Sequence, residues 1–334
     1  MNIAFYELEP WEQEHVKKAL RGHKLSFYNS PLGMDNVRKD TELLGIFIYS
    51  EVTCALLDKM PKLKLIATMS TGFDHIDIAY ARSKGVCVCN VPTYGENTVA
   101  EHTFALILAL SRKMYPSIKR THEMHSFETD ASLRGFDLKG KTIGIVGCGN
   151  IGRHVLRIAK GFEMNVLVFD PHRDEALSKG MGFAYATLPG LLKNSDIVTL
   201  HVPLLPQTKH LLDKRAFRLM KQGAYLVNTA RGGLVETQAL LSALTSGKLG
   251  GAALDVLEEE TSIKEEKQLL HTEFKNSVDL KAVLAGHMLM KMENVVLTPH
   301  NAFNSSEALL RIINTTLDNL KSYAKTGKTL NPVA

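Results

Sequence analysis

Cysteine is scarce in this chain, and so are long apolar runs and blocks of one charge. Its four cysteines are Cys54, Cys87, Cys89 and Cys148. Four are too few for a disulfide framework in 334 residues, which favours a reduced, cytoplasmic protein. The best apolar run, Phe104–Leu110, is far shorter than the roughly 20 residues that span a membrane. Acidic Glu7 and Glu9 follow the first strand directly, which is unlike a signal peptide.

Charge is balanced along the sequence. The 40 Lys and Arg exceed the 35 Asp and Glu by only five, and no basic block resembles a nucleic-acid-binding arm. We therefore expect no nucleic-acid partner and no membrane partner. His122-Glu123-Met124-His125 has a spacing close to that of metal ligands but lacks further ligands, so we expect no metal site. With 45% apolar residues, the chain can fill about two globular cores.

Short β-branched runs alternate with amphipathic segments from end to end, which predicts an α/β fold with doubly wound parallel sheets. The strands expected in the first 95 residues are Ile3–Phe5, Leu25–Tyr28, Ile46–Tyr49, Leu65–Met69 and Val86–Cys89. A long helix is expected from Thr98 toward His125, with a kink near Pro116. The helical stretches near residues 100 and 300 are natural hinges, so we divide the chain into 1–100, 101–299 and 300–334.

A second series of strands follows residue 140. These strands are Thr142–Val146, Val166–Phe169, Ile197–Val202, Ala224–Asn228, Ala252–Val256 and Val295–Thr298. Six strands with helical stretches between them predict a Rossmann sheet. The apolar spacing from Ser305 to Lys325 predicts one more helix, which we expect to pack on the N-terminal half.

A glycine motif lies between the first strand and helix of this second series. Gly147, Gly149 and Gly152 occur in Gly147-Cys148-Gly149-Asn150-Ile151-Gly152, and Asp170 ends the next strand. The glycines permit a tight turn, close approach of a pyrophosphate and close packing of helix on strand. Asp170 is placed to accept both ribose hydroxyls of NAD, and its charge disfavours the 2′-phosphate of NADP. The motif therefore predicts an NAD site.

Three further groups end predicted strands, where open α/β sheets bind their ligands. Arg231 follows the fourth strand of the second series, Asp255 and three glutamates follow the fifth, and His300 follows the sixth. A guanidinium can hold a substrate carboxylate in a fork and polarise a carbonyl. An imidazolium can deliver a proton, and a carboxylate beside it favours that protonated form. This set is suited to carbonyl reduction beside a nicotinamide.

At these residues the chain closely resembles the D-isomer-specific 2-hydroxyacid dehydrogenases. The resemblance runs over nearly the whole chain and includes the glycine motif. It also rests on Ser70-Thr71-Gly72-Phe73-Asp74-His75-Ile76-Asp77, Val91-Pro92-Thr93-Tyr94, Val99-Ala100-Glu101-His102, His201-Val202-Pro203, Asn228-Thr229-Ala230-Arg231-Gly232, Ala253-Leu254-Asp255-Val256 and Pro299-His300. We interpret Glu101 and His102 as structural residues of the helix that begins near Thr98.

The resemblance implies two domains with an active-site cleft between them. A smaller flavodoxin-like substrate domain takes residues 1–100 and 300–334, and a Rossmann NAD domain takes 101–299. It implies that Arg231 binds substrate, that Glu260 pairs with the imidazole and that His300 donates the proton; the spacing D-V-x-E-x-E selects Glu260. Backbone at Thr71 and Gly72 would receive the substrate carboxylate. The implied cofactor contacts besides the glycines are Asn150, Ile151, Asp170, Val202, Pro203, Thr208, Thr229, Ala230, Arg231 and Asp255; a helix cap is the alternative for Asp255.

Tyr94 and Phe303 make the chain similar to the D-lactate dehydrogenase branch, in which an aromatic pair narrows the pocket. Pyruvate and D-lactate are therefore the favoured substrates, and a D-2-hydroxy acid with a larger side chain, such as D-2-hydroxyisocaproate, is the alternative. A second alternative is an NAD(H)-sensing binding protein on the same scaffold, similar to the C-terminal-binding co-repressors. The family also implies a homodimer formed through the NAD domain, with residues 114–136 as an arm.

Overall fold

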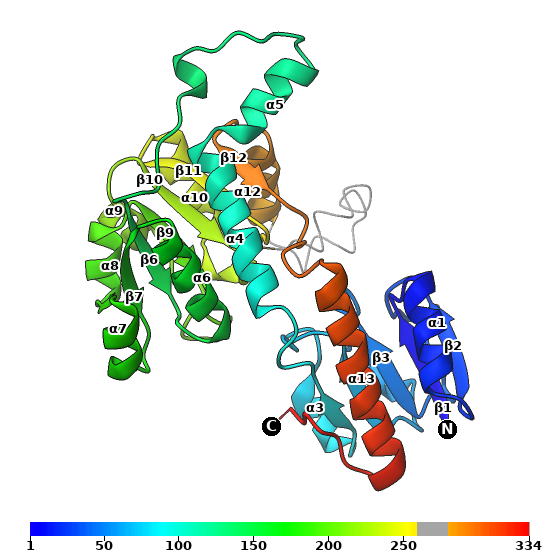
Figure 1. Cartoon of the computed structure of the whole chain (residues 1–334). Helices are drawn as coiled ribbons and strands as arrows, with labels where there is room; N and C mark the ends of the chain where they lie inside the picture. The colour runs from blue at the N-terminus through cyan, green and yellow to red at the C-terminus, as the bar shows by residue number, and fades with distance from the viewer. Residues whose placement is uncertain (259–279, 334) are drawn as a thin grey trace. The chain divides into compact units, whose positions relative to one another are not determined.

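The chain divides into two compact units, each with its own parallel sheet (Figure 1). The computed structural model describes residues 1–258 and 280–333. The first unit comprises Met1–Gly95 and Asn304–Ala334, and the second comprises Glu96–Phe303. The predicted α/β class with two doubly wound parallel sheets is confirmed.

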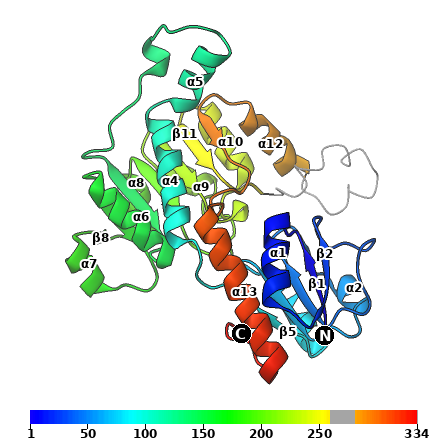
Figure 2. The same ribbon diagram turned by 45° about the vertical axis from the view of Figure 1, so that its right-hand side comes forward.

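The first unit has a five-stranded sheet in the order β2-β1-β3-β4-β5, which is the flavodoxin-like order. Its strands are β1 (Asn2–Tyr6), β2 (Lys24–Tyr28), β3 (Leu43–Ile46), β4 (Leu65–Thr68) and β5 (Cys87–Cys89). Its helices are α1 (Pro10–Ala19), α2 (Cys54–Asp58), α3 (Ile78–Ser83) and α13 (Ser306–Thr326). Helices α1 and α13 lie side by side (Figure 2), so the C-terminal helix completes the unit begun by the first residues.

The prediction of a strand at Ile46–Tyr49 is wrong by three residues. Strand β3 ends at Ile46 because the carboxylate of Glu7 takes the backbone N–H groups beyond it, at 3.2 Å from Phe47 N and 3.0 Å from Tyr49 N. Glu7 is in the left-handed region, with φ 64°, which turns its side chain toward these groups. Burial raises the pKa of Glu7, and the hydrogen bonds that it accepts lower it in part. A side-chain acceptor therefore replaces the sheet ladder here.

The second unit has a seven-stranded sheet in the order β12-β11-β10-β9-β6-β7-β8. Its strands are β6 (Thr142–Val146), β7 (Asn165–Phe169), β8 (Ala184–Tyr185), β9 (Ile197–Leu200), β10 (Ala224–Asn228), β11 (Leu249–Leu254) and β12 (Val295–Leu297). Six of these are the predicted strands. The two-residue edge strand β8 was not predicted, because two residues that pair only with Leu167 and Val168 are too short to show a periodic pattern.

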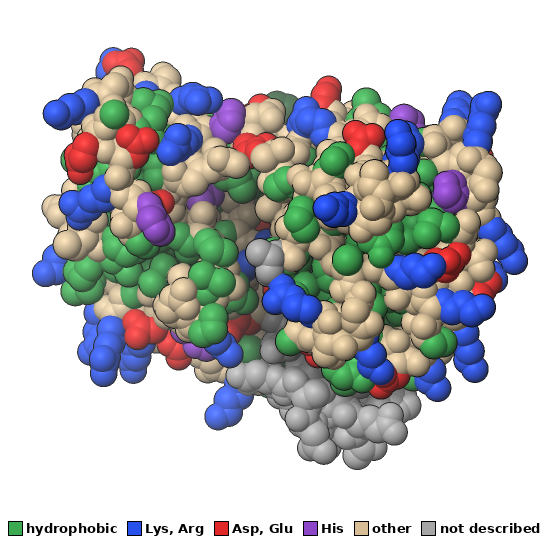
Figure 3. Space-filling view, turned by 90° about the horizontal axis from the view of Figure 1, so that it is seen from below, with side chains coloured by type: hydrophobic (Ala, Val, Ile, Leu, Met, Phe, Trp, Pro, Cys, Tyr) green, Lys and Arg blue, Asp and Glu red, His purple; other side chains and the backbone are tan. Residues whose placement is uncertain are grey.

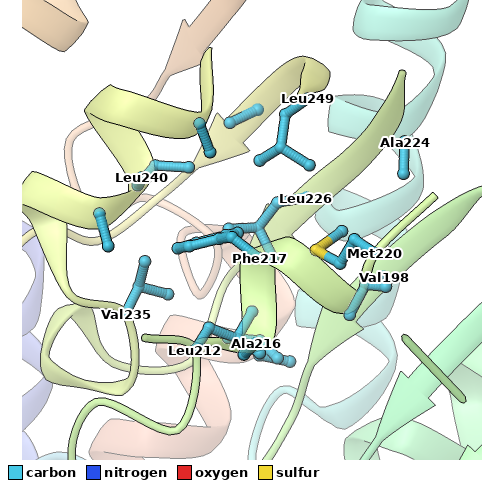
Figure 4. Packing of buried hydrophobic residues seen from close by; sticks show 14 of the residues in the cluster. Val198, Leu212, Ala216, Phe217, Met220, Ala224, Leu226, Val235, Leu240 and Leu249 are labelled. Atoms are coloured by element: carbon cyan, nitrogen blue, oxygen red, sulfur yellow. The ribbon is translucent and has the colours of Figure 1, made fainter. Parts of the chain in front are cut away.

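Helices cover both faces of the seven-stranded sheet. They are α4 (Glu96–Ser111), α5 (Met114–His122), α6 (Asn150–Gly161), α7 (Glu175–Met181), α8 (Leu188–Asn194), α9 (Lys214–Leu219), α10 (Thr237–Thr245) and α12 (Leu280–Met290), with 3-10 turns at Ala131–Leu133 and Gly232–Leu234. Helices α4 and α6 share one core with Ile143, Ile145 and Val227. On the other face Phe217 and Leu226 lie in a second core with α8, α9, α10 and α12 (Figure 4). A parallel sheet is stable when both faces are buried in this way.

The long helix expected from Thr98 breaks three residues before the predicted kink at Pro116. Helix α4 ends at Ser111, and Lys113 has a left-handed backbone, with φ 51°. The returning chain fixes this end, because Phe136 N donates to the carbonyl of Ser111 at 2.8 Å. Pro116 lies in the first turn of α5, where its missing N–H costs nothing.

Charges of both signs are mixed over the surface. On the face shown in Figure 3, Lys and Arg lie among Asp, Glu and apolar side chains, in agreement with the small net charge of the sequence. Within residues 1–258 and 280–333, no helix has the length and apolar character needed to cross a membrane.

Candidate active site

The strand order brings the predicted site residues of the second unit that the structure describes to one edge of its sheet. Parallel strands end at the same edge, and here the order β12-β11-β10-β9-β6-β7 aligns the residues that follow each strand. Those residues are His300, Asp255, Arg231, Val202, Gly147 and Asp170, in that order across the sheet. From β6 the chain adds β7 and β8 on one side of the sheet and then β9 to β12 on the other side. The boundary between β6 and β9 is therefore the topological switch point, where such sheets bind ligands.

The glycine motif forms a tight turn with open space at its centre. Gly147 has φ 96°, and a Cβ on it would lie 2.7 Å from the carbonyl oxygen of His201. A Cβ on Gly152 would lie 2.1 Å from the carbonyl oxygen of Gly147, so helix and turn are in close contact. Gly149, by contrast, has no atom within 4 Å of an added Cβ, and as the N-cap of α6 it offers no side-chain acceptor to the first-turn N–H groups. The turn therefore fits a dinucleotide pyrophosphate at a helix N-terminus.

Asp170 lies directly beside this turn. Its Oδ2 accepts from Cys148 N at 2.7 Å, and its Oδ1 accepts from His172 N at 2.8 Å. These bonds fix the carboxylate at the carboxyl end of β7, the position from which an acid reaches ribose hydroxyls. Burial raises the pKa of the Cys148 thiol, so this side chain is a neutral part of the turn rather than a nucleophile.

Threonine hydroxyls hold the loops after β9 and β10, one by bonds within its own loop and one by a contact with helix α4. The hydroxyl of Thr208 accepts from Leu205 N and donates to Pro203 O, both at 2.7 Å. Thr229 is buried and lies 2.9 Å, oxygen to oxygen, from Thr103 of α4. Val202 and Pro203 begin the first of these loops, and Asn150 and Ile151 begin α6 opposite them across the switch point. Two predicted cofactor threonines therefore also stabilise the loops that carry them.

Arg231 is held by a turn that Asn228 closes. The buried amide of Asn228 accepts from Ala230 N at 3.0 Å and donates to the carbonyl of Arg231 at 2.9 Å. The guanidinium Nη1 donates to Ala230 O at 2.8 Å. A Cβ on Gly232 would lie 2.1 Å from the backbone of Leu257, so the loop after β11 packs directly on this turn.

The first of the three glutamates after β11 is already engaged. Glu258 Oε1 lies 2.5 Å from His210 Nε2, while Oε2 accepts from Thr237 N at 2.9 Å and from its hydroxyl at 2.6 Å. His210 N also donates to Gly233 O at 2.8 Å, which connects this cluster to the Arg231 turn. His210 was not predicted as a site residue, because it belongs to none of the sequence motifs. Glu260 lies outside the described residues.

Asp255 holds the loop that carries His300. The residue is buried, and its carboxylate accepts from Asn301 N at 2.8 Å and Ala302 N at 2.9 Å, and from the hydroxyl of Thr298. Burial raises the pKa of Asp255, but hydrogen bonds from His102, Thr298 and the loop amides outweigh this and leave it below its ordinary value. Asp255 is therefore ionised at neutral pH, and its carboxylate acts on the loop after β12.

His300 has a left-handed backbone, with φ 52°. Such a backbone is uncommon for residues other than glycine, although His is among those enriched there. Its N–H donates to Asp255 O at 2.8 Å, and its ring meets that of Phe303 edge to face, with centroids 6.4 Å apart. The imidazole on this loop therefore lies beside the ring of Phe303.

In the first unit the predicted substrate residues lie at the carboxyl edge of their own sheet. The hydroxyl of Thr71 donates to Val91 O at 2.8 Å, and that of Ser70 donates to Gly72 O at 2.6 Å. These bonds shape the loop after β4. Arg311 Nε of α13 donates to the carbonyl of Tyr94, which follows β5.

Residues 104–302 match the model of the D-isomer specific 2-hydroxyacid dehydrogenase, NAD binding domain. The chain belongs to this family. The D-lactate dehydrogenase of Escherichia coli is 34% identical to this 2-hydroxyacid dehydrogenase and matches over 97% of both proteins. The D-lactate dehydrogenase of Aquifex aeolicus, solved in complex with NAD and lactic acid, has a TM-score of 0.85 and 35% identity over 98% of this chain and 99% of that one. A solved D-2-hydroxyisocaproate dehydrogenase has a TM-score of 0.82 and 30% identity over 100% of this chain and 99% of that one.

These similarities confirm the predicted family and the predicted NAD cofactor. The glycine turn and Asp170 fit that cofactor by their own geometry, since one offers backbone N–H groups and the other a fixed carboxylate. The chain is thus an NAD-dependent D-2-hydroxyacid dehydrogenase.

Proposed function

We propose that this dehydrogenase interconverts pyruvate and D-lactate. The observation that carries the proposal is the arrangement of His300 and Arg231 at the carboxyl edge of one sheet, with β11 between their strands. Strands lie about 4.8 Å apart, so the two positions are roughly 10 Å apart, a span that two side chains and a three-carbon acid can fill. The similarity to the Aquifex enzyme supports the same substrate.

In this mechanism Arg231 holds the substrate carboxylate and polarises the carbonyl, while His300 delivers the proton to the carbonyl oxygen. Glu260, which the family spacing D-V-x-E-x-E selects, is the acid that we assign to the imidazole; both oxygens of Glu258 are engaged elsewhere. When bound, NADH supplies the hydride. We further propose that backbone at Thr71 and Gly72 and the hydroxyl of Tyr94 contact the substrate carboxylate.

Phe303 supports a small substrate. Its ring lies edge to face with that of His300, and we propose that it limits the room for the substituent next to the reacting carbon. One methylene in such a pocket is worth about 1–3 kcal/mol, enough to rank related acids.

The test is NADH oxidation by the purified protein over a panel of pyruvate, 2-oxoisocaproate and glyoxylate. We expect the highest kcat/KM with pyruvate, and oxidation of D-lactate but not of L-lactate in the reverse direction. A higher value with 2-oxoisocaproate would favour the larger-substrate alternative. NADH binding without turnover of any of the acids would favour the NAD(H)-sensing alternative.

The cofactor assignment gives a first mutational prediction. Asp170→Ala should weaken NADH binding by roughly 10- to 150-fold, because a charged hydrogen bond is worth about 1.5–3 kcal/mol. It should also narrow the preference for NADH over NADPH, since the carboxylate no longer disfavours a 2′-phosphate. Fluorescence titration with both cofactors measures each constant.

Asp174→Ala is the matched control for this change. Asp174 follows four residues later and caps α7, accepting from Leu177 N at 2.9 Å. Its loss should lower stability by about 1 kcal/mol while leaving both cofactor constants unchanged. Equal effects of the two variants on NADH binding would contradict the role of Asp170.

We also propose a homodimer formed through residues 114–136. Helix α5 buries none of its residues, and the segment leaves Ile118, Met124 and Phe127 exposed by 50%, 69% and 96%. In Figures 1 and 2 this segment projects from the body of its unit. Apolar groups of this kind gathered on one projecting segment are typical of an association surface.

The combined variant Ile118→Asp/Phe127→Asp should therefore sediment as a monomer, whereas the native chain sediments as a dimer. Leu330→Asp is the control, because Leu330 is 61% exposed but belongs to the other unit. A native chain of monomer mass, or a combined variant that remains a dimer, would contradict the proposal. Analytical ultracentrifugation gives both masses.

For the cellular location we propose the cytoplasm. All four cysteines are free, including Cys87 and Cys89 on the same strand, which is the state that a reducing compartment maintains. Fractionation of cells that express the native chain tests this; recovery outside the cytoplasm would contradict it.

A further inference from the structure

His102, on helix α4, reaches the loop that carries His300. Its Nε2 lies 3.1 Å from the hydroxyl oxygen of Thr298 and 3.4 Å from Asp255 Oδ1. The side chain of His102 is 20% exposed and that of Asp255 only 1%, so the contact is largely shielded from water. The two ends of the contact are 196 residues apart in the sequence but belong to the same unit.

The chemistry of the three groups determines which of them donates. Asp255 is ionised, because its pKa lies below the ordinary value, so its carboxylate can only accept. Thr298 has a single hydroxyl hydrogen, which it donates to Asp255. The remaining bond can form only if His102 carries a hydrogen on Nε2 and donates it. This assigns the Nε2–H form of His102 from its partners.

The same network fixes the backbone on both sides of His300. Thr298 precedes His300, and the N–H groups of Asn301 and Ala302, which follow it, donate to the Asp255 carboxylate at 2.8 and 2.9 Å. The N–H of His300 itself donates to the carbonyl of Asp255 at 2.8 Å. The left-handed backbone of His300 is thus maintained by contacts at three points around it.

Helix α4 is a firm base for this contact. Ala100, Phe104 and Ile107 are buried in the core that α4 shares with α6 and the sheet. His102 is therefore attached to an element whose position is set by packing, whereas the segment after β12 is irregular backbone. A hydrogen-bond donor on such a helix can fix the position of a loop more precisely than contacts within the loop can.

We propose that His102 is a positioning residue for the reaction: its Nε2–H, acting through Thr298 and Asp255, holds the His300 imidazole in the geometry needed for proton transfer. This inference rests on the proposed catalytic role of His300. A misplacement of about 1 Å in a reacting group can lower the rate by 10²-fold. Loss of the donor should therefore lower kcat by roughly 10- to 100-fold, with little change in NADH binding.

The experiment compares His102→Leu with His102→Gln. Leucine removes the donor, whereas the amide N–H of glutamine can reach the place of Nε2 and donate to the same oxygen. We expect kcat of His102→Leu to be roughly 10- to 100-fold below the native value in both directions. The kcat of His102→Gln should be close to the native value. Dissociation constants for NADH, from fluorescence titration, should stay within about twofold of the native value.

His15→Leu is the matched control. His15 Nε2 makes one hydrogen bond between two helices, to Asn314 Oδ1 at 2.8 Å, in the unit that does not contain His300. This change should lower thermal stability to a similar degree but leave kcat unchanged. A loss of kcat in His15→Leu equal to that in His102→Leu would mean that general destabilisation explains both, and would overturn the proposal.

Thr298→Val provides a second route if His102→Leu does not fold. If His102 acts through Thr298, the double variant His102→Asn/Thr298→Val, in which the shorter amide cannot reach the place of Nε2, should be no slower than Thr298→Val alone. Losses that multiply would overturn the proposal, and so would an equal loss in His102→Leu and His102→Gln or no loss in either. His300→Ala separates this failure from that of the proposed function, because a fully active His300→Ala enzyme would refute the catalytic role itself.

Discussion

His300→Ala is expected to lower kcat by roughly 10²- to 10⁴-fold for both 2-oxo acid reduction and D-hydroxy acid oxidation, the usual contribution of a positioned acid–base group. Both directions should fall, since the same imidazole donates the proton in one and accepts it in the other. The residue follows β12 on the loop that Asp255 holds, and its ring lies edge to face with that of Phe303. Steady-state rates in the two directions measure the effect.

The pH profile distinguishes proton transfer from mere support of the pocket. For reduction, the alkaline limb of kcat/KM reports the acid of the free enzyme. In His300→Ala that limb should flatten, because no protonated imidazole remains to be lost. NADH binding should persist, since the glycine turn and Asp170 follow other strands. A variant with near-native turnover, or with an unchanged alkaline limb, would mean that another group supplies the proton.

The elements that the sequence analysis predicted well are those whose causes are local. The glycine turn is an example, because a positive φ at Gly147 and the close approach at Gly152 act within a few residues of the motif itself. The strand pattern likewise predicted a parallel Rossmann sheet, since alternating strands and helices leave few topologies. Parallel strands end at the same edge of a sheet, so His300, Arg231 and Asp170, which each follow a strand, could be expected at one edge from the sequence.

The errors occur where a distant side chain competes with the backbone pattern. The apolar run Phe47-Ile48-Tyr49 looks like a strand, but Glu7, some 40 residues earlier, takes two of its N–H groups. The return of Phe136 to the carbonyl of Ser111 similarly places the helix break before Pro116. No window of local sequence contains either partner, so periodicity could not reveal them.

The candidate site shows the same division. Arg231 and His300 were proposed as site residues from their motifs, whereas the side chains that contact the neighbouring loops are remote in sequence: His102 reaches the His300 loop from α4, and His210 contacts Glu258 near the Arg231 turn. The motif that contains His102 predicted only a structural residue of the helix, because the sequence does not reveal which loop the side chain contacts. The structure also narrows an ambiguity among three consecutive glutamates, since Glu258 is occupied by His210 and Thr237.

Arg231→Gln is expected to lower kcat/KM for pyruvate by at least roughly 10³-fold. Two contributions combine, because the guanidinium both binds the carboxylate and stabilises charge that develops on the carbonyl oxygen. Loss of a charged hydrogen bond to the carboxylate accounts for about 10- to 150-fold. Loss of a donor to the developing oxyanion accounts for about 10²- to 10³-fold in kcat. Both KM and kcat should therefore change.

Arg231→Lys separates charge from geometry. An ammonium keeps the positive charge but cannot form the planar fork. The decrease in kcat/KM for pyruvate should therefore be smaller in Arg231→Lys than in Arg231→Gln, yet still well above tenfold. Arg218→Gln is the control, because Arg218 is an exposed arginine near the end of α9 and its removal should leave the kinetics unchanged. The side chain of Asn228 bonds to the backbone of Ala230 and Arg231, so the turn should persist when the Arg231 side chain is changed. Unchanged NADH binding in Arg231→Gln would show this. A KM for pyruvate that stays at the native value in both variants would show that the substrate carboxylate is bound elsewhere.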